Sequence, residues 1–183
     1  MKYALIFLIT LLTYSCVPLK IAPDIANGKV YAPKKFKKQL PEQHTYVFND
    51  PKDANEFYNY VNAKFQIAYD DATGNIPITM NDKTYYLTFY EVERDTKTVN
   101  LVPILVNSAM ENKGYTPAFE EAEVTRVGYW YVALTISDAA LADALNPNYK
   151  DHQEVLEYAN HMRNEYLTTV EYIEVYLRST IKD

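Results

Sequence analysis

Side chains that could act in catalysis are scattered along the chain and match no motif that holds a phosphate or activates a serine. The chain has 4 glycines, too few and too far apart for a P-loop or a dinucleotide-binding turn. The serines that follow residue 15 lie outside any G-x-S-x-G elbow; they are Ser108, Ser137 and Ser179. The sequence therefore predicts no catalytic residue, and a dispersed catalytic set stays an alternative.

Acidic and histidine side chains near the C-terminus come nearest to a metal site. They share one polar arc of a predicted helix and are Glu154, Glu157, His161 and Glu165. Carboxylate and imidazole groups could together hold a divalent cation. A solvated charged face explains the same pattern, because side chains three or four residues apart on a helix commonly pair in water. The sequence predicts no metal ion and no cofactor.

The single cysteine, Cys16, stands directly after a short apolar segment that follows one lysine. The apolar run from Tyr3 to Leu12 is too short to cross a bilayer, since a membrane-spanning helix needs about 20 apolar residues. A charged start, an apolar stretch, the small residue Ser15 and then a cysteine are typical of an export signal. This order resembles the lipobox of bacterial lipoproteins, which implies removal of residues 1–15 and a lipid on Cys16.

Two acidic and six basic residues lie in residues 16–43, a balance of +4, whereas residues 44–183 hold 11 basic and 22 acidic residues, a balance of −11. The first of these segments also contains four prolines and shows little hydrophobic periodicity. These features predict a basic, semi-extended tether over residues 16–43. The acidic remainder argues against nucleic acid as a partner.

The tether is expected to lead into a single α+β domain over residues 44–183. Alternating apolar and polar residues predict its strands, which are 44–49, 84–94 and 129–136, with 98–107 as the hairpin partner of 84–94 after a turn at 95–97. Apolar residues at three- and four-residue spacing and helix-starting residues predict its helices, which are 51–65, 137–145 and 151–181. We therefore expect a small antiparallel sheet with helices packed on one face and a long C-terminal amphipathic helix.

A polar stretch over residues 107–123 separates two predicted strands, and loops of this length are often functional or mobile. The residues in it that could contact a partner are Tyr115, Glu120, Glu121 and Glu123. Tyrosine is abundant, with 18 in the chain, and an exposed tyrosine surface could stack on sugars or grip a protein. Packing at the edge of the core is the alternative use of these rings.

Two segments, CVPLKIAP at residues 16–23 and NDPKDANEFY at residues 49–58, resemble small lipoproteins of Bacteroidota-type bacteria. That group has no assigned activity or active-site residues, so the resemblance implies a location and no mechanism. The residues after Cys16 lack the acidic cluster and the aspartate that would resemble other sorting signals. The resemblance thus implies the periplasmic face of the outer membrane.

The leading hypothesis is a non-enzymatic envelope lipoprotein, attached to the membrane through Cys16, whose domain binds a protein or a glycan. One alternative is a periplasmic hydrolase or metal-dependent enzyme without a recognisable motif. Another is a structural accessory subunit of an envelope complex. A pocket with converging carboxylates or a histidine would favour the enzyme, whereas a flat tyrosine surface rimmed by acids would favour binding.

Overall fold

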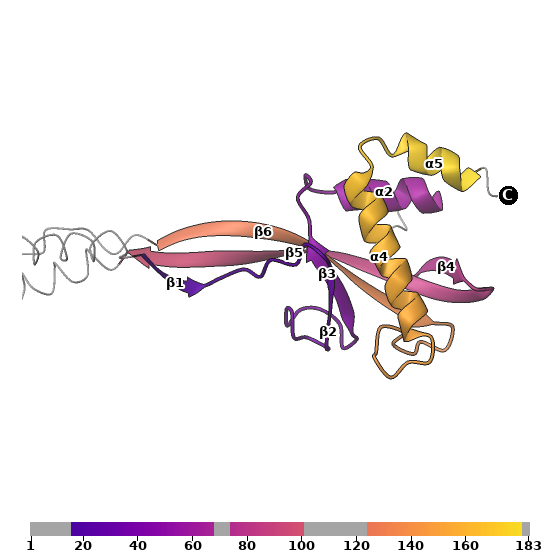
Figure 1. Cartoon of the computed structure of the whole chain (residues 1–183), viewed down its shortest axis with the longest axis horizontal. Coiled ribbons are helices and arrows are strands. Elements are labelled where there is room, and N and C mark those ends of the chain that lie inside the picture. The colour runs from indigo at the N-terminus through magenta and orange to yellow at the C-terminus, as the bar shows by residue number, and fades with distance from the viewer. Residues whose placement is uncertain (1–15, 68–73, 101–123, 181–183) are drawn as a thin grey trace, which may run out of the picture. The chain divides into compact units, whose positions relative to one another are not determined.

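The computed structural model describes residues 16–67, 74–100 and 124–180, and these fall into two compact units (Figure 1). The smaller unit spans Met1–Pro23 and Glu93–Tyr129, and the larger spans Asp24–Val92 and Trp130–Asp183. Two long strands, β5 (Lys83–Asn100) and β6 (Val124–Asp138), supply residues to both units. No helix among the described residues is long and apolar enough to cross a bilayer.

In the smaller unit, strand β1 (Cys16–Lys20) pairs antiparallel with the end of β5, so that Cys16 lies opposite Asn100. The backbone N–H of Ala22 donates to Oγ1 of Thr96 at 3.0 Å. The predicted turn at 95–97 is wrong, because β5 continues through these residues to Asn100. Pairing with β1 supplies the hydrogen bonds that keep this part of the chain extended.

The larger unit is built on antiparallel strand pairs, which confirms an α+β fold. Strand β2 (Lys29–Tyr31) pairs with β3 (Thr45–Asn49), and β3 pairs with β6. Strand β4 (Ile76–Met80) pairs with β5, and the strand order is β1-β5-β6-β3-β2. The strands predicted over 44–49, 84–94 and 129–136 are confirmed within β3, β5 and β6. Alternate side chains are buried along β5, whereas β3 and residues 131–136 of β6 are buried on both faces.

The described residues of the larger unit form three helices: α2 (Glu56–Phe65), α4 (His152–Thr168) and α5 (Ile173–Thr180). Their buried side chains join those of the strands in one hydrophobic cluster. Phe57 of α2 is fully buried there among the rings of Phe48, Phe89 and Tyr166. Helix α2 begins later than the sequence predicts, because Asn55 directly before it has a left-handed conformation, with φ 68°. The Asp50 carboxylate, which lies before the helix, accepts from the Lys52 backbone N–H at 3.1 Å and from the Tyr166 hydroxyl at 2.8 Å.

The predicted single helix over residues 151–181 is wrong, since the chain leaves the helical conformation between α4 and α5. Thr169 is extended, with φ −84° and ψ 125°. The ammonium group of Lys52 donates to the carbonyl oxygens of Tyr166 and Thr169, each at 2.6 Å. A cation at the C-terminal end of a helix binds carbonyls that have no partner within the helix, so Lys52 stabilises this break.

Residues 24–40 also depart from the prediction of a tether, because they are part of the larger unit. Strand β2 lies within them, and Ile25, Phe36 and Leu40 are buried. The ring of Phe36 contacts that of Tyr131, with centroids 5.1 Å apart. Tyr131 alternates along β6 with residues that face the helices, so Phe36 packs on the opposite face of the sheet. The helices therefore pack on one face and Phe36 on the other, while β2 is a strand of the sheet itself.

The helix predicted over residues 137–145 is wrong as well. Ser137 and Asp138 end strand β6, the residues after them form turns, and an isolated bridge joins Ser137 to Asp143. The Asp138 carboxylate accepts hydrogen bonds from the backbone N–H groups of Ala140 and Ala142, each at 2.9 Å. A side chain that binds nearby backbone donors in this way competes with helix formation.

Candidate functional site

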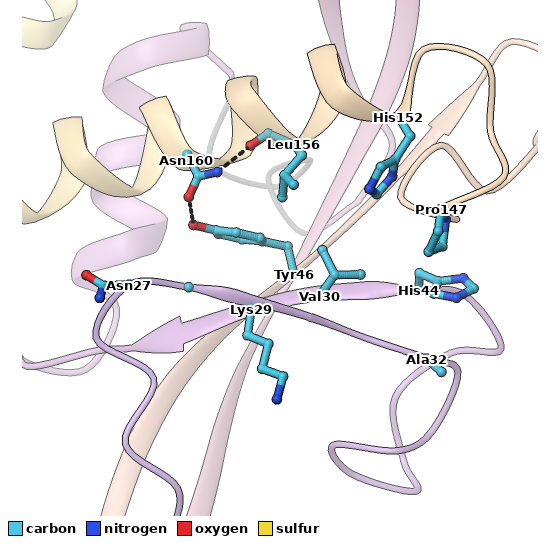
Figure 2. Close-up of a pocket in the computed structure, with 11 residues that line it drawn as sticks. Asn27, Lys29, Val30, Ala32, His44, Tyr46, Pro147, His152, Leu156 and Asn160 are labelled. Atoms are coloured by element: carbon cyan, nitrogen blue, oxygen red, sulfur yellow. Dashed lines mark hydrogen bonds between the residues drawn. The ribbon is translucent and has the colours of Figure 1, made fainter.

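A cavity of about 450 Å³ opens within the larger unit, between the β2–β3 ribbon and helix α4 (Figure 2). Its lining comes from three regions: the segment before and within β2, the start of β3, and α4 with the turn that precedes it. The lining residues are Asn27, Gly28, Lys29, Val30, Ala32, His44, Tyr46, Pro147, His152, Leu156 and Asn160. Cavities of 300–1,000 Å³ are typical of small-molecule sites.

The wall formed by α4 follows from helical periodicity. His152, Leu156 and Asn160 are spaced four residues apart, so they lie along one face of the helix. The Tyr46 hydroxyl donates to Oδ1 of Asn160 at 2.6 Å, and Nδ2 of Asn160 donates to the carbonyl of Leu156 at 2.9 Å (Figure 2). This chain of bonds fixes the Asn160 amide and the Tyr46 ring, and burial raises the pKa of the Tyr46 hydroxyl.

Gly28 is required where the chain passes this wall. Its φ is +71°, a backbone conformation that residues with a side chain rarely adopt. A Cβ atom on Gly28 would lie 2.0 Å from the Tyr46 hydroxyl oxygen. The backbone can therefore approach Tyr46 only because residue 28 has no side chain.

Two histidines lie with Pro147 at one end of the cavity, and Asn27 lies at the other (Figure 2). The Asp143 carboxylate holds His44: its Oδ2 is 2.8 Å from Nδ1 of the ring and accepts from the His44 backbone N–H at 2.7 Å. The side chains of His44 and Asp143 are mostly buried, with exposed fractions of 18% and 20% respectively. An imidazole held at Nδ1 keeps its other nitrogen for a ligand or a proton.

His152 is held less completely than His44. Its Nδ1 is buried, and the described residues offer it no hydrogen-bond partner. A buried polar atom without a partner is costly, because it has lost its hydrogen bond to water. The two imidazoles are the groups of the lining that can act as acids or bases near neutral pH.

The residues singled out from the sequence lie elsewhere. Tyr115, Glu120, Glu121 and Glu123 fall in 101–123, outside the described residues. Cys16 begins strand β1 in the smaller unit.

The polar arc of α4 does not form a metal site. The Glu165 carboxylate accepts from the Tyr60 hydroxyl at 2.5 Å and pairs with Lys64. Glu154, Glu157 and His161 are exposed. Over residues 16–67, 74–100 and 124–180, no group of three or more His, Cys, Asp and Glu side chains is placed to hold a metal ion.

The cavity itself was not predicted from the sequence. The four-residue spacing of His152, Leu156 and Asn160 is a signal that could have indicated one shared face. The pairing of His44 with Asp143 joins residues 99 positions apart, which no local pattern indicates.

Comparisons of the chain with protein-family models, curated proteins and solved structures found no match. What the cavity can do follows from its own side chains. A bonded tyrosine and amide fix one wall, and two imidazoles line one end.

Proposed function

We propose that this protein is a lipid-anchored component of the bacterial cell envelope whose larger unit binds a glycan in the cavity beside α4. The observation that carries the binding role is the cavity lining, where hydrogen-bonding side chains are held in place by neighbours. Tyr46 and Asn160 bond each other, and Asp143 holds His44. Groups fixed in advance lose little freedom when a ligand binds.

A sugar suits this lining because each hydroxyl group can both donate and accept a hydrogen bond. Imidazole and amide groups are mixed with the apolar side chains of Val30, Pro147 and Leu156. A sugar ring also has apolar C–H faces that can rest on such side chains. No serine or cysteine is among the lining residues that the structure describes, which favours binding over covalent catalysis.

Blocking the cavity is expected to abolish glycan binding. Ala32 lines the cavity and is itself exposed, so Ala32→Trp would place an indole at the rim without disturbing a buried residue. The measurement is binding of the detergent-solubilised full chain to an array of bacterial and host glycans. The matched control is Ala139→Trp, which adds the same ring at an exposed position outside the cavity.

If both variants keep the glycan signals of the parent protein, the cavity is not the binding site. If the parent protein binds no glycan on the array, the proposed ligand class is wrong.

Lipid attachment has a separate test. Replacing Cys16 by alanine is expected to move the protein from the membrane fraction to the soluble fraction, because the acyl chains on the cysteine would supply the attachment. Each buried methylene contributes about 0.8 kcal/mol, so two or more chains hold a protein firmly. The measurement is fractionation of cells, with Ser15→Ala as the control that keeps the cysteine and a small preceding residue. Membrane retention of Cys16→Ala would contradict the proposal.

The location proposed for the anchored protein is the periplasmic face of the outer membrane. The support is the sequence after Cys16, where Val17, Pro18 and Leu19 carry no charge. Separation of inner and outer membranes on a density gradient tests this placement.

A hydrolase is the second candidate. Two histidines line the cavity, and a pocket with a histidine is the feature expected to favour an enzyme. His44 is oriented by the Asp143 carboxylate beside a cavity, which is the arrangement of a general base. Such a base would activate water for attack on an ester or amide bond. Turnover of model esters that disappears in His44→Gln and persists in His161→Gln would favour this candidate over a binding module.

A further inference from the structure

The two ends of the cavity differ in chemistry. The imidazoles of His44 and His152 lie at one end, and the carboxamides of Asn27 and Asn160 lie at the other (Figure 2). Asn160 belongs to α4, whereas Asn27 belongs to the exposed segment before β2. Gly28 lines the cavity between Asn27 and β2. We call Asn27, Gly28 and Asn160 the amide end.

The carboxamide of Asn160 is held in place, and half of its bonding capacity is used. Its Oδ1 accepts from the Tyr46 hydroxyl at 2.6 Å, and its Nδ2 donates to the Leu156 carbonyl at 2.9 Å. A carboxamide can donate two hydrogen bonds and accept two. The bonds to described residues therefore leave one N–H and one lone pair of Asn160 for a ligand. A secondary amide can bond to either of them, because it has one N–H and one carbonyl.

Aliphatic side chains lie beside the amide end. Leu156 precedes Asn160 by four residues on α4, and Val30 is opposite Tyr46 in the register of β2 and β3. The side chains of Leu156 and Val30 point toward one another across the cavity (Figure 2), and both are partly buried against the hydrophobic cluster. A small apolar group next to the ligand's amide can rest on these two side chains.

The charge of the lining disfavours a ligand with a free amine at this position. None of the described residues that line the cavity is acidic. The nearby Asp143 carboxylate is already engaged by His44 and by the backbone N–H of Leu145. A protonated amine that enters without a carboxylate partner loses its hydration and gains no opposite charge. An acetylated amine is neutral and does not have this cost.

We infer that the cavity takes an N-acetylated amino sugar, whose acetamido group bonds to the amide end and whose methyl group rests between Leu156 and Val30. This rests on the proposed glycan binding and names the class of glycan. The ring hydroxyls lie toward the other end, where the His44 imidazole, held by Asp143, can bond to them.

Three sugars that differ only at carbon 2 provide the test: glucose, glucosamine and N-acetylglucosamine. The measurement is a saturation-transfer NMR titration of each sugar with the detergent-solubilised full chain, with detergent alone as the blank. We expect N-acetylglucosamine to bind at least tenfold more tightly than the other two, because only its acetamido group makes the bonds to Asn160. The acetyl methyl group should receive the strongest saturation, since aliphatic side chains surround it.

Asn160→Asp tests the residue that carries the inference. The Tyr46 hydroxyl keeps an acceptor in this variant, so the wall of the cavity stays bonded. N-acetylglucosamine should bind about tenfold more weakly, and glucosamine should become the preferred sugar, because a carboxylate accepts a charge-assisted bond from an ammonium group. Asn164→Asp is the matched control, since it makes the same change at an exposed position of α4 outside the cavity. If Asn160→Asp fails to fold, the three sugars on the parent protein decide.

The outcomes separate the two proposals. Glucose or glucosamine binding the parent protein as tightly as N-acetylglucosamine would overturn the acetamido class and leave glycan binding standing. An unchanged preference in folded Asn160→Asp would overturn the contact with the amide end. N-methylacetamide binding as tightly as N-acetylglucosamine would show a site for a bare amide and overturn the sugar. If no probe binds, the acetamido inference is overturned, and an empty glycan array would remove the proposed function as well.

Discussion

Replacing Phe57 by alanine is expected to lower the free energy of unfolding of the larger unit by about 3–5 kcal/mol. The ring is fully buried at the centre of the hydrophobic cluster. It contacts four aromatic rings, with centroid separations of 5.0 to 6.0 Å, and these belong to Phe48, Tyr60, Phe89 and Tyr166. The contacts come from α2, α4, β3 and β5, so the cavity left by alanine cannot be closed by a shift of one element. Urea denaturation measures the loss.

Phe65→Ala is the matched control for this prediction. Phe65 ends the same helix and is only partly buried against the cluster. Phe65→Ala should lower the free energy of unfolding by less than half as much as Phe57→Ala, because less of the Phe65 ring is removed from water in the folded state. Equal losses for the two variants would show that Phe57 is not the centre of the packing.

Removing the Glu165 carboxylate is the second large effect that we expect, about 3 kcal/mol for Glu165→Ala. Its side chain is 14% exposed and pairs with Lys64, which is 18% exposed. It also accepts from the Tyr60 hydroxyl. Alanine would leave the Tyr60 hydroxyl and the Lys64 ammonium of α2 mostly buried without their acceptor. The cost of these two unsatisfied donors exceeds the attraction of an ion pair in water.

A surface ion pair of the same kind supplies the control. Lys34 and Glu42 also form a close pair, but their side chains are 46% and 78% exposed. Glu42→Ala should leave the free energy of unfolding almost unchanged, because water solvates both groups in either state. A comparable loss for the two alanine variants would contradict the role assigned to burial.

The pH dependence gives the Glu165 prediction a second readout. Burial raises the pKa of the Glu165 carboxyl, but the bonds from Lys64 and Tyr60 outweigh it and leave that pKa below its ordinary value. A carboxyl with a lowered pKa stabilises the fold above its unfolded pKa, and this contribution disappears as pH falls through the folded pKa. The stability gap between the parent protein and Glu165→Ala should therefore narrow between about pH 6 and pH 3. A gap that widens on acidification would contradict this assignment.

Strands were the part of the fold that sequence patterns predicted best. The alternation of apolar and polar side chains along residues 84–94 is a local pattern that can be read from the sequence. In β5, Tyr85, Leu87 and Phe89 of this pattern are buried. The continuation of β5 to Asn100 depends on a partner strand that is distant in sequence. Asp95-Thr96-Lys97 has the composition of a turn, and pairing with β1 overrides that preference.

Helix starts and the cavity were harder to predict because distant residues determine them. Asp50 has the properties of an N-cap, yet its carboxylate is engaged by Tyr166, 116 residues later. The basic, proline-containing segment that reads as a tether contains the buried residues Ile25, Phe36 and Leu40. These are few apolar residues among prolines and lysines, and the burial of Phe36 follows from its contact with Tyr131 of β6. The cavity depends on the same segment of the chain, since Gly28 and strand β2 form one side of the cavity.

The end of helix α4 depends on a residue that is distant in the sequence. Lys52 binds the carbonyls of Tyr166 and Thr169, so the group that stops the helix comes from a residue more than 110 positions earlier. Local preferences alone allow the helix to run on through residues 169–172, as the amphipathic pattern of 151–181 indicates. The length of α4 therefore depends on the meeting of two distant parts of the chain, and is a property of the tertiary structure rather than of the helix alone.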